Sequence, residues 1–178
     1  MRKPYFSTEA ERFAFQAWHT LKLSAPVDVE RVADRLNIDV YYEEFVSEID
    51  GVYLRMPGVP PVIAVNNTYT KPLGRRRFTL AHEIGHHLLC RRMPDNTRLF
   101  FVDAVSTHKS MTERACDKFA ALLLMPEDLT RQWFEELSAN PEHRVAIMAE
   151  RFQVSPGAMR VRLKELNLPY QLYLYRRK

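Results

Sequence analysis

TLAHEIGHHLL, at residues 79–89, is the stretch of this sequence that predicts most about its fold and chemistry. His82 and His86 are four residues apart, so one turn of an α-helix would bring both imidazoles onto the same face. Glu83 would be rotated by roughly 100° from His82, beside a metal held by the two histidines rather than under it. That position suits a base acting on a water molecule at the metal. The spacing therefore predicts a zinc hydrolase site.

The flanks of this motif predict that its helix is buried, because apolar residues occur on both sides of the histidine pair. They are Phe78, Leu80, Ala81, Ile84, Leu88 and Leu89. Buried imidazoles and carboxylates must find partners, and the alternative to a metal is a pair of core histidines hydrogen-bonded to backbone or carboxylate. Gly85 costs the helix about 1 kcal/mol, which indicates that another backbone approaches closely there.

A catalytic zinc needs a third protein ligand, with the fourth position left to water. Residues 111–126, MTERACDKFAALLLMP, predict a second helix that becomes apolar from Ala115 and ends at Pro126. Glu113 is the best candidate ligand, and Asp117, one turn later, can accept the second ring N–H of a ligating histidine. The alternatives are a charge at Glu113 favoured by the helix dipole and a solvated carboxylate at Asp117.

Other side chains are further candidates for the site. Cys116 and Asp103 are alternative third ligands, although a thiol in an apolar helix is more often a packed core residue. His87 would point about 100° away from the second histidine of the motif, toward substrate or behind the ligands. His108, or a tyrosine such as Tyr53, could stabilise an oxyanion or contact the substrate. The sequence does not choose among these candidates.

Residues 77–86, RFTLAHEIGH, resemble the RFTLAHELGH signature of the ImmA/IrrE family of bacterial and phage metallopeptidases. Residues 113–126 are similar to that family's second block, ExxAdxFAaxLLMP, and the strand-like residues 62–66, VIAVN, form a third match. Together these matches cover roughly residues 50–130. Cys116 departs from the family pattern, which usually has alanine at this position.

The resemblance implies His82, His86 and Glu113 as the ligands of Zn²⁺, with Mn²⁺ as the alternative metal, and Glu83 as the base. It also implies a zinc-dependent endopeptidase that cleaves a helix-turn-helix repressor and so derepresses stress or mobile-element genes. Two other interpretations stay open. One is a DNA-binding transcriptional regulator with a structural metal, and the other is a sensor that sequesters a repressor without cutting it.

The order of the predicted elements indicates an α+β fold with a zincin-like core. Apolar residues at helical spacing predict helices over residues 8–23 and 26–37. Strands are expected at residues 38–45, 51–55 and 62–66. This small N-terminal sheet would pack on the active-site helix, and it would either offer an edge to an extended substrate or only cover the core. Residues 91–109 predict an ordered loop or a short strand near the cleft.

Residues 145–166 resemble a helix-turn-helix. The match is partial, because Gln153 occupies the turn position where glycine is usual, and Arg162 stands where an apolar residue is expected. We therefore predict a metallopeptidase domain over residues 1–138, which includes the N-terminal helices and sheet. A C-terminal helix-turn-helix-like helical module follows over residues 139–178.

The basic excess of the chain lies in its tail. Residues 141–178 hold eight Lys or Arg against three Asp or Glu, whereas residues 1–140 hold 18 against 19. Contact of the tail with DNA is one interpretation of this charge. We favour packing of the C-terminal helices on the catalytic domain. The run Arg75-Arg76-Arg77 before the motif opposes the helix dipole, and a solvated charged turn is favoured there over contact with substrate or nucleic acid.

Composition supports a chain with a real core, because 46% of its 178 residues are apolar. No apolar run approaches 18 residues, and Glu9, Glu11 and Arg12 interrupt any signal-peptide core, so we expect neither a membrane span nor secretion. Two cysteines, Cys90 and Cys116, are too few for a disulfide framework and suggest a reducing cytoplasm. We predict a cytoplasmic protein.

Overall fold

The computed structural model describes residues 8–46, 48–104, 110–137 and 140–170 and has a mixed α+β fold. The elements within these ranges are, in chain order, α1 (Glu9–Leu21), α2 (Val29–Arg35), β1 (Asp39–Glu43), β2 (Ile49–Arg55), β3 (Val62–Asn66), α3 (Leu73–Leu89), β4 (Leu99–Ala104), α4 (Met111–Leu124), α5 (Glu127–Glu136), α6 (Pro141–Phe152) and α7 (Pro156–Glu165). The predicted helices and strands are present with ends that differ by a few residues, as expected for boundaries read from sequence.

The four strands form one sheet in the order β1-β3-β2-β4. β1 runs parallel to β3, and β2 is antiparallel to both β3 and β4. The predicted loop or short strand over residues 91–109 thus contains a strand that extends the sheet at its edge. Its residues alternate between half-buried and exposed, which is the pattern of a strand with one face on the core.

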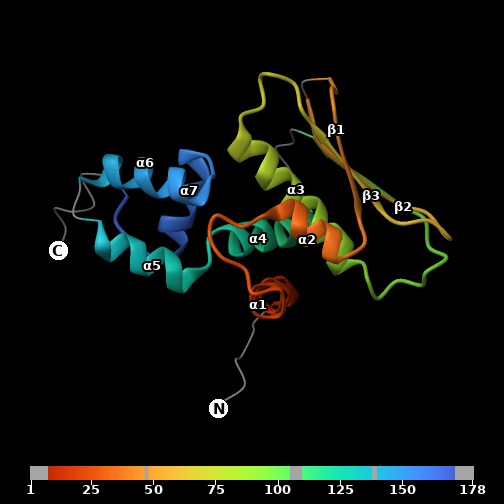
Figure 1. Cartoon of the computed structure of the whole chain (residues 1–178), viewed down its shortest axis with the longest axis horizontal. Helices are drawn as coiled ribbons and strands as arrows, with labels where there is room; N and C mark the ends of the chain where they lie inside the picture. Colours follow the sequence, from red (N-terminus) through yellow and green to blue (C-terminus); the bar gives the residue numbers. More distant parts are fainter. Residues whose placement is uncertain (1–7, 47, 105–109, 138–139, 171–178) are drawn as a thin grey trace, which may run out of the picture.

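Helix α3 is the central layer of the protein. Figure 1 shows it lying across one face of the sheet, with α4 and α1 on its other side. Tyr53 and Ile63 of the sheet and Leu80 and Ile84 of α3 are all fully buried. Because α3 has neighbours on several sides, it is buried almost all round, as the apolar flanks of its motif predict. On the far side, Trp18 Nε1 donates to the Leu123 carbonyl at 2.9 Å and fixes α1 on α4.

Gly85 marks the close contact between α3 and α4 that its place in the motif predicts. A methyl group in the Cβ position of Gly85 would lie 3.1 Å from Cys116 Cα and 3.2 Å from Cys116 Cβ. These distances are tighter than ordinary van der Waals contact. The absence of a side chain at Gly85 therefore lets the two helices approach until their backbones nearly touch.

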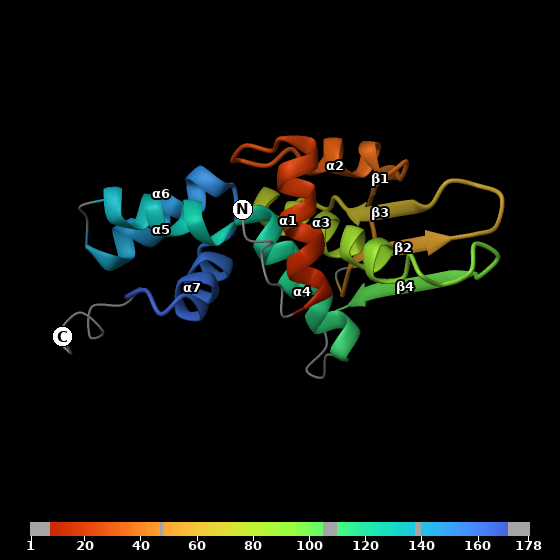
Figure 2. The same ribbon diagram turned by 90° about the horizontal axis from the view of Figure 1, so that it is seen from below.

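The last three helices, α5 to α7, form a lobe beside the sheet and its helices (Figures 1 and 2). Gln153, between α6 and α7, has a φ of 53° and adopts the left-handed conformation that usually favours glycine. Arg162, at the position expected to be apolar, is 5% exposed, and its Nε donates to the Met125 carbonyl at 2.9 Å. The predicted boundary between residues 138 and 139 lies outside the described residues, and the helix-turn-helix assignment of this lobe stays a prediction.

The three arginines before the motif lie in the first turns of α3, where the Arg75 side chain is half exposed and Arg77 is buried. Arg77 is buried, and its guanidinium donates to the carbonyls of Val27 and Gln153 at 2.6 and 3.2 Å. Arg75 forms an ion pair with the buried Asp50. These arginines therefore join the start of α3 to neighbouring segments. Sequence reasoning missed this role, because carbonyl partners leave no charge pattern in the sequence.

Within the described residues, no helix is long and apolar enough to cross a bilayer.

Replacement of Gly74 by alanine should loosen the contact between α3 and the C-terminal lobe. A Cβ on Gly74 would lie 2.7 Å from Ser155 N and 2.7 Å from the Val154 carbonyl carbon, both backbone atoms that cannot rotate away. We expect Gly74→Ala to lower the free energy of unfolding by about 1–3 kcal/mol, the usual cost of overpacking. Urea denaturation measures it.

Gly157→Ala is the matched control, since a Cβ on Gly157 in the first turn of α7 would meet nothing closer than Ser155 Oγ at 3.7 Å. Its unfolding free energy should be unchanged or raised by up to about 1 kcal/mol through helix propensity. Equal stabilities of the two variants would show that the Gly74 contact can relax without cost.

Candidate metal centre

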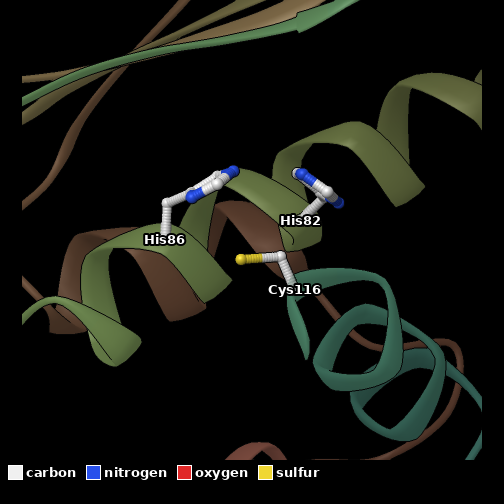
Figure 3. Close-up of side chains that lie close together, drawn as sticks. All are labelled: His82, His86 and Cys116. Carbon is white, nitrogen blue, oxygen red and sulfur yellow. The ribbon is translucent and has the colours of Figure 1, made fainter. Parts of the chain in front are cut away.

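Helix α3 presents His82, Glu83 and His86 to the interior of the protein. The two imidazoles are 1% exposed, their ring centroids are 5.0 Å apart, and Glu83 is completely buried. Figure 3 shows both rings on the same side of α3. A pair of histidines one turn apart, with a buried carboxylate next to the first of them, is the arrangement that the motif spacing predicts.

Helix α4 brings two carboxylates to these histidines. Ser110 caps its first turn by accepting from the Glu113 backbone N–H at 3.2 Å. The carboxylate of Glu113 lies between the rings, with Oε2 3.1 Å from His82 Nε2 and Oε1 3.3 Å from His86 Nε2. One turn later, Asp117 Oδ1 lies 3.0 Å from His82 Nδ1. Each imidazole therefore points its Nε2 at Glu113, and His82 uses its other nitrogen on Asp117.

This donor set fits a metal ion. Two imidazole nitrogens and one carboxylate converge, and zinc takes such donors at about 2.0–2.2 Å. Both oxygens of Glu83 are buried without a hydrogen-bond partner among the described residues, which a nearby cation would compensate. In the chain without metal, burial raises the pKa of Glu83 to about 8, His82 opposes the rise, and Asp103 and Glu113 add to it.

The two histidines differ in their protonation. Burial lowers the pKa of His86 to about 3, and the charge of His82 contributes, so this imidazole is neutral and ready to donate a lone pair. Burial also opposes protonation of His82, but the hydrogen bond to Asp117 and the surrounding carboxylates outweigh it, and its pKa is raised. Asp117 therefore sets both the charge and the orientation of the His82 ring.

Two further side chains lie at the site, and both are third-ligand candidates from the sequence. A nitrogen of His82, a nitrogen of His86 and Cys116 Sγ all lie within 4.8 Å of one another. Asp103 on β4 forms a similar group with His82 and Glu83. Burial raises the pKa of the Cys116 thiol, so it is protonated in the chain without metal. The assignment of Glu113 as the third ligand stays a prediction.

The predicted oxyanion or substrate contacts lie beside the site. Tyr53 is fully buried on β2, and its hydroxyl lies 3.0 Å from His87 Nδ1, so the two residues contact each other. Burial raises the pKa of Tyr53 to about 12, and burial with the charges of Arg55 and Arg91 lowers that of His87 to about 4. His108 lies outside the described residues. The proposed contacts of these residues with a reacting substrate remain predictions.

Sequence reasoning missed Phe101 and Gly51. The Phe101 ring stacks on His86, with 4.3 Å between centroids and 13° between planes, and it also stacks on Tyr53. A Cβ on Gly51 of β2 would lie 2.9 Å from Glu83 Oε1, so the missing side chain leaves room for this carboxylate. The period-two alternation in β4 could have placed Phe101 on the inner face. Nothing in the sequence relates Gly51 to Glu83.

A buried histidine pair and a buried carboxylate on one helix, facing two carboxylates of a second helix, are the arrangement expected of a metallopeptidase. Comparison with protein families makes the assignment more specific. The model of the IrrE N-terminal-like domain, a peptidase family, matches residues 33–164. This match spans more than half of the chain, so the chain belongs to that family, as the sequence resemblance predicts. No curated protein matches the chain.

Loss of the Asp117 carboxylate should weaken metal binding without removing a donor to the metal. In Asp117→Asn, His82 Nδ1 loses the charged acceptor that fixes its tautomer. We expect the zinc dissociation constant to rise about 10–100-fold, the usual effect of such a partner. Titration against a chromophoric chelator measures the constant.

Asp34→Asn is the matched control, because Asp34 is exposed on α2, away from the histidines. It should bind zinc like the wild type. An Asp117→Asn variant with unchanged zinc affinity would mean that the His82 ring is oriented by other contacts.

Proposed function

We propose that this chain is a metal-dependent endopeptidase that cleaves a helix-turn-helix repressor and thereby relieves repression of stress or mobile-element genes. Membership of a peptidase family supports the reaction class. The observation that carries the proposal is the Glu83 carboxylate, which is completely buried, has both oxygens without a partner among the described side chains, and directly follows a histidine that contacts Glu113. A buried carboxyl group without a hydrogen-bond partner destabilises the fold, and such groups are concentrated at functional sites.

In this proposal His82, His86 and Glu113 hold the metal, Zn²⁺ or Mn²⁺. The ion would supply Lewis acidity toward the scissile carbonyl and toward water. Glu83 takes a proton from the attacking water on its carboxylate and passes it to the nitrogen of the leaving amine. Burial raises the pKa of Glu83 in the chain without metal, and a bound cation would lower it again and leave a carboxylate that can accept the proton.

Two neighbours keep the histidines in position. Asp117 holds the His82 ring through Nδ1 at 3.0 Å. His86 Nδ1 has no hydrogen-bond partner among the described residues, and the face of Phe101 fixes its ring instead. Both imidazoles are therefore preorganised, one by a charge-assisted hydrogen bond and the other by stacking.

The edge of the sheet supports an extended protein substrate. Among the described strands β4 pairs only with β2, so its other side can add a further strand. Phe101 and Asp103 alternate along β4 on the side of the site, whereas Phe100 and Val102 are exposed. A peptide paired with β4 would run past Phe101 and Asp103, beside the two histidines. Backbone hydrogen bonds to β4 would bind the peptide with little dependence on its amino-acid sequence.

The DNA-binding alternative has less support from the basic residues of α7. Arg162 is buried and bound to the Met125 carbonyl, and Arg160 forms an ion pair with Glu142 at 2.7 Å. Reversal of the charge of Arg162 would therefore test folding before it tested DNA contact. The basic side chains of this helix favour packing and docking of the lobe. A repressor is the partner that we propose for it.

Glu83→Gln should abolish cleavage while zinc stoichiometry stays near one, because the substitution removes the base and no metal ligand. The isosteric amide also avoids a cavity at this buried position. The purified full chain is incubated with zinc and with a purified candidate helix-turn-helix repressor. Defined fragments are identified by mass spectrometry, and zinc is measured by atomic absorption.

His82→Ala is the companion variant, and it should lose both metal and cleavage. A Glu83→Gln variant that cleaves at the wild-type rate would contradict the assignment of the base. A wild-type protein that binds the repressor and leaves it intact would instead identify the sequestering sensor.

A further inference from the structure

Cys116 lies within reach of the two histidines and is not used by the proposed reaction. Its side chain is completely buried on α4, one turn after Glu113. Cys116 Sγ and one nitrogen from each of His82 and His86 lie within 4.8 Å of one another. Figure 3 shows the sulfur extending from α4 toward the two rings on α3.

The close contact between α3 and α4 explains why this thiol points at the site. The Cα and Cβ atoms of Cys116 lie against Gly85, where even a methyl group would be 3.1 Å from Cys116 Cα. Cys116 therefore starts against the turn of α3 that carries both histidines, and its sulfur lies within 4.8 Å of a ring nitrogen of each. The packing between α3 and α4 therefore also places the Cys116 sulfur near the two histidines.

We propose that Cys116 is a fourth protein ligand of the metal held by His82, His86 and Glu113. This inference rests on the proposed metal site. Thiolate, imidazole and carboxylate are all ligands of zinc, with Zn–S near 2.3 Å and Zn–N near 2.0–2.1 Å, so donors of a tetrahedral site lie about 3.5 Å apart. The three donor atoms lie within 4.8 Å of one another, about 1 Å more than this separation at most.

Ligation by Cys116 would close the site. Zinc centres with four protein ligands are structural, whereas catalytic centres keep one position for water or substrate. On ligation the S–H bond breaks, the S–metal bond forms and the proton leaves to solvent. On opening, the sulfur regains a proton and vacates the position. The sulfur-bound form is then a resting state of the peptidase that does not turn over.

Cobalt substitution tests for the sulfur ligand directly. The full chain is loaded with Co²⁺, and a thiolate-to-cobalt charge-transfer band is sought in the near ultraviolet. We expect the band in the wild type and its loss in Cys116→Ala and Cys116→Ser, with one cobalt still bound. Two different small replacements are used, so that one variant still reports on the sulfur ligand if the other disturbs packing against α3. The zinc dissociation constant should also rise by more than about tenfold, since a lost ligand costs at least as much as a lost outer partner.

Cys90→Ala is the matched control, because Cys90 is the other buried free cysteine and is not part of the histidine group. It should keep the band. A wild-type cobalt protein without the band, or a Cys116→Ala protein that retains it, would overturn the proposal. Cleavage of the repressor is measured in parallel and should be several-fold faster in Cys116→Ala. If neither the wild type nor any variant cleaves, but the band is present in the wild type and in Cys90→Ala and absent from both Cys116 variants, the ligand stands and the proposed peptidase function fails.

Discussion

The contact between α3 and α4 at Gly85 and Cys116 determines how the carboxylates of α4 lie relative to the histidines of α3. The two helices come close enough there that a single methyl group would not fit without displacement. Glu113 lies one turn before this point on α4 and Asp117 directly after it, so their carboxylates reach His82 at 3.1 and 3.0 Å. A wider helix separation would move both carboxylates out of hydrogen-bond distance. Packing and chemistry therefore depend on the same glycine.

The buried carboxylate of this site destabilises the fold when no cation is bound. The pKa of Glu83 is raised by burial, and Asp103 and Glu113 add negative charge around it. A carboxyl group whose folded pKa exceeds its unfolded value destabilises the fold as pH rises above the unfolded value. A bound cation reverses this, because it favours the ionised form. Metal binding and stability are therefore linked in this fold, as in other sites that collect buried like charges.

The sequence predicts the site residues on α3 better than the residues of the sheet that contact them. His82, Glu83 and His86 follow from helical spacing, and Gly85 indicates that another backbone approaches, because both are local patterns. Phe101 and Gly51 do not follow, because their contacts with α3 depend on the register of β4 and β2 in the sheet. The contacts of the arginines at residues 75–77 could not be predicted for the same reason. Arg77 binds the carbonyls of Val27 and Gln153, 50 and 76 residues away, and no local pattern encodes such partners.

Phe101 connects the strand proposed to bind the substrate with one of the two histidines. Its ring lies on His86, and its backbone belongs to β4, the strand on which an extended substrate would pair. A peptide that adds to β4 would restrain the strand and, through the stacked ring, the imidazole whose Nδ1 has no hydrogen-bond partner within the described part of the chain. His82 has no such dependence, because its second nitrogen is held by α4. The two histidines thus differ in their supports, because His86 contacts Glu113 through Nε2 but is otherwise held by the Phe101 ring, so a peptide bound at β4 would act on His86.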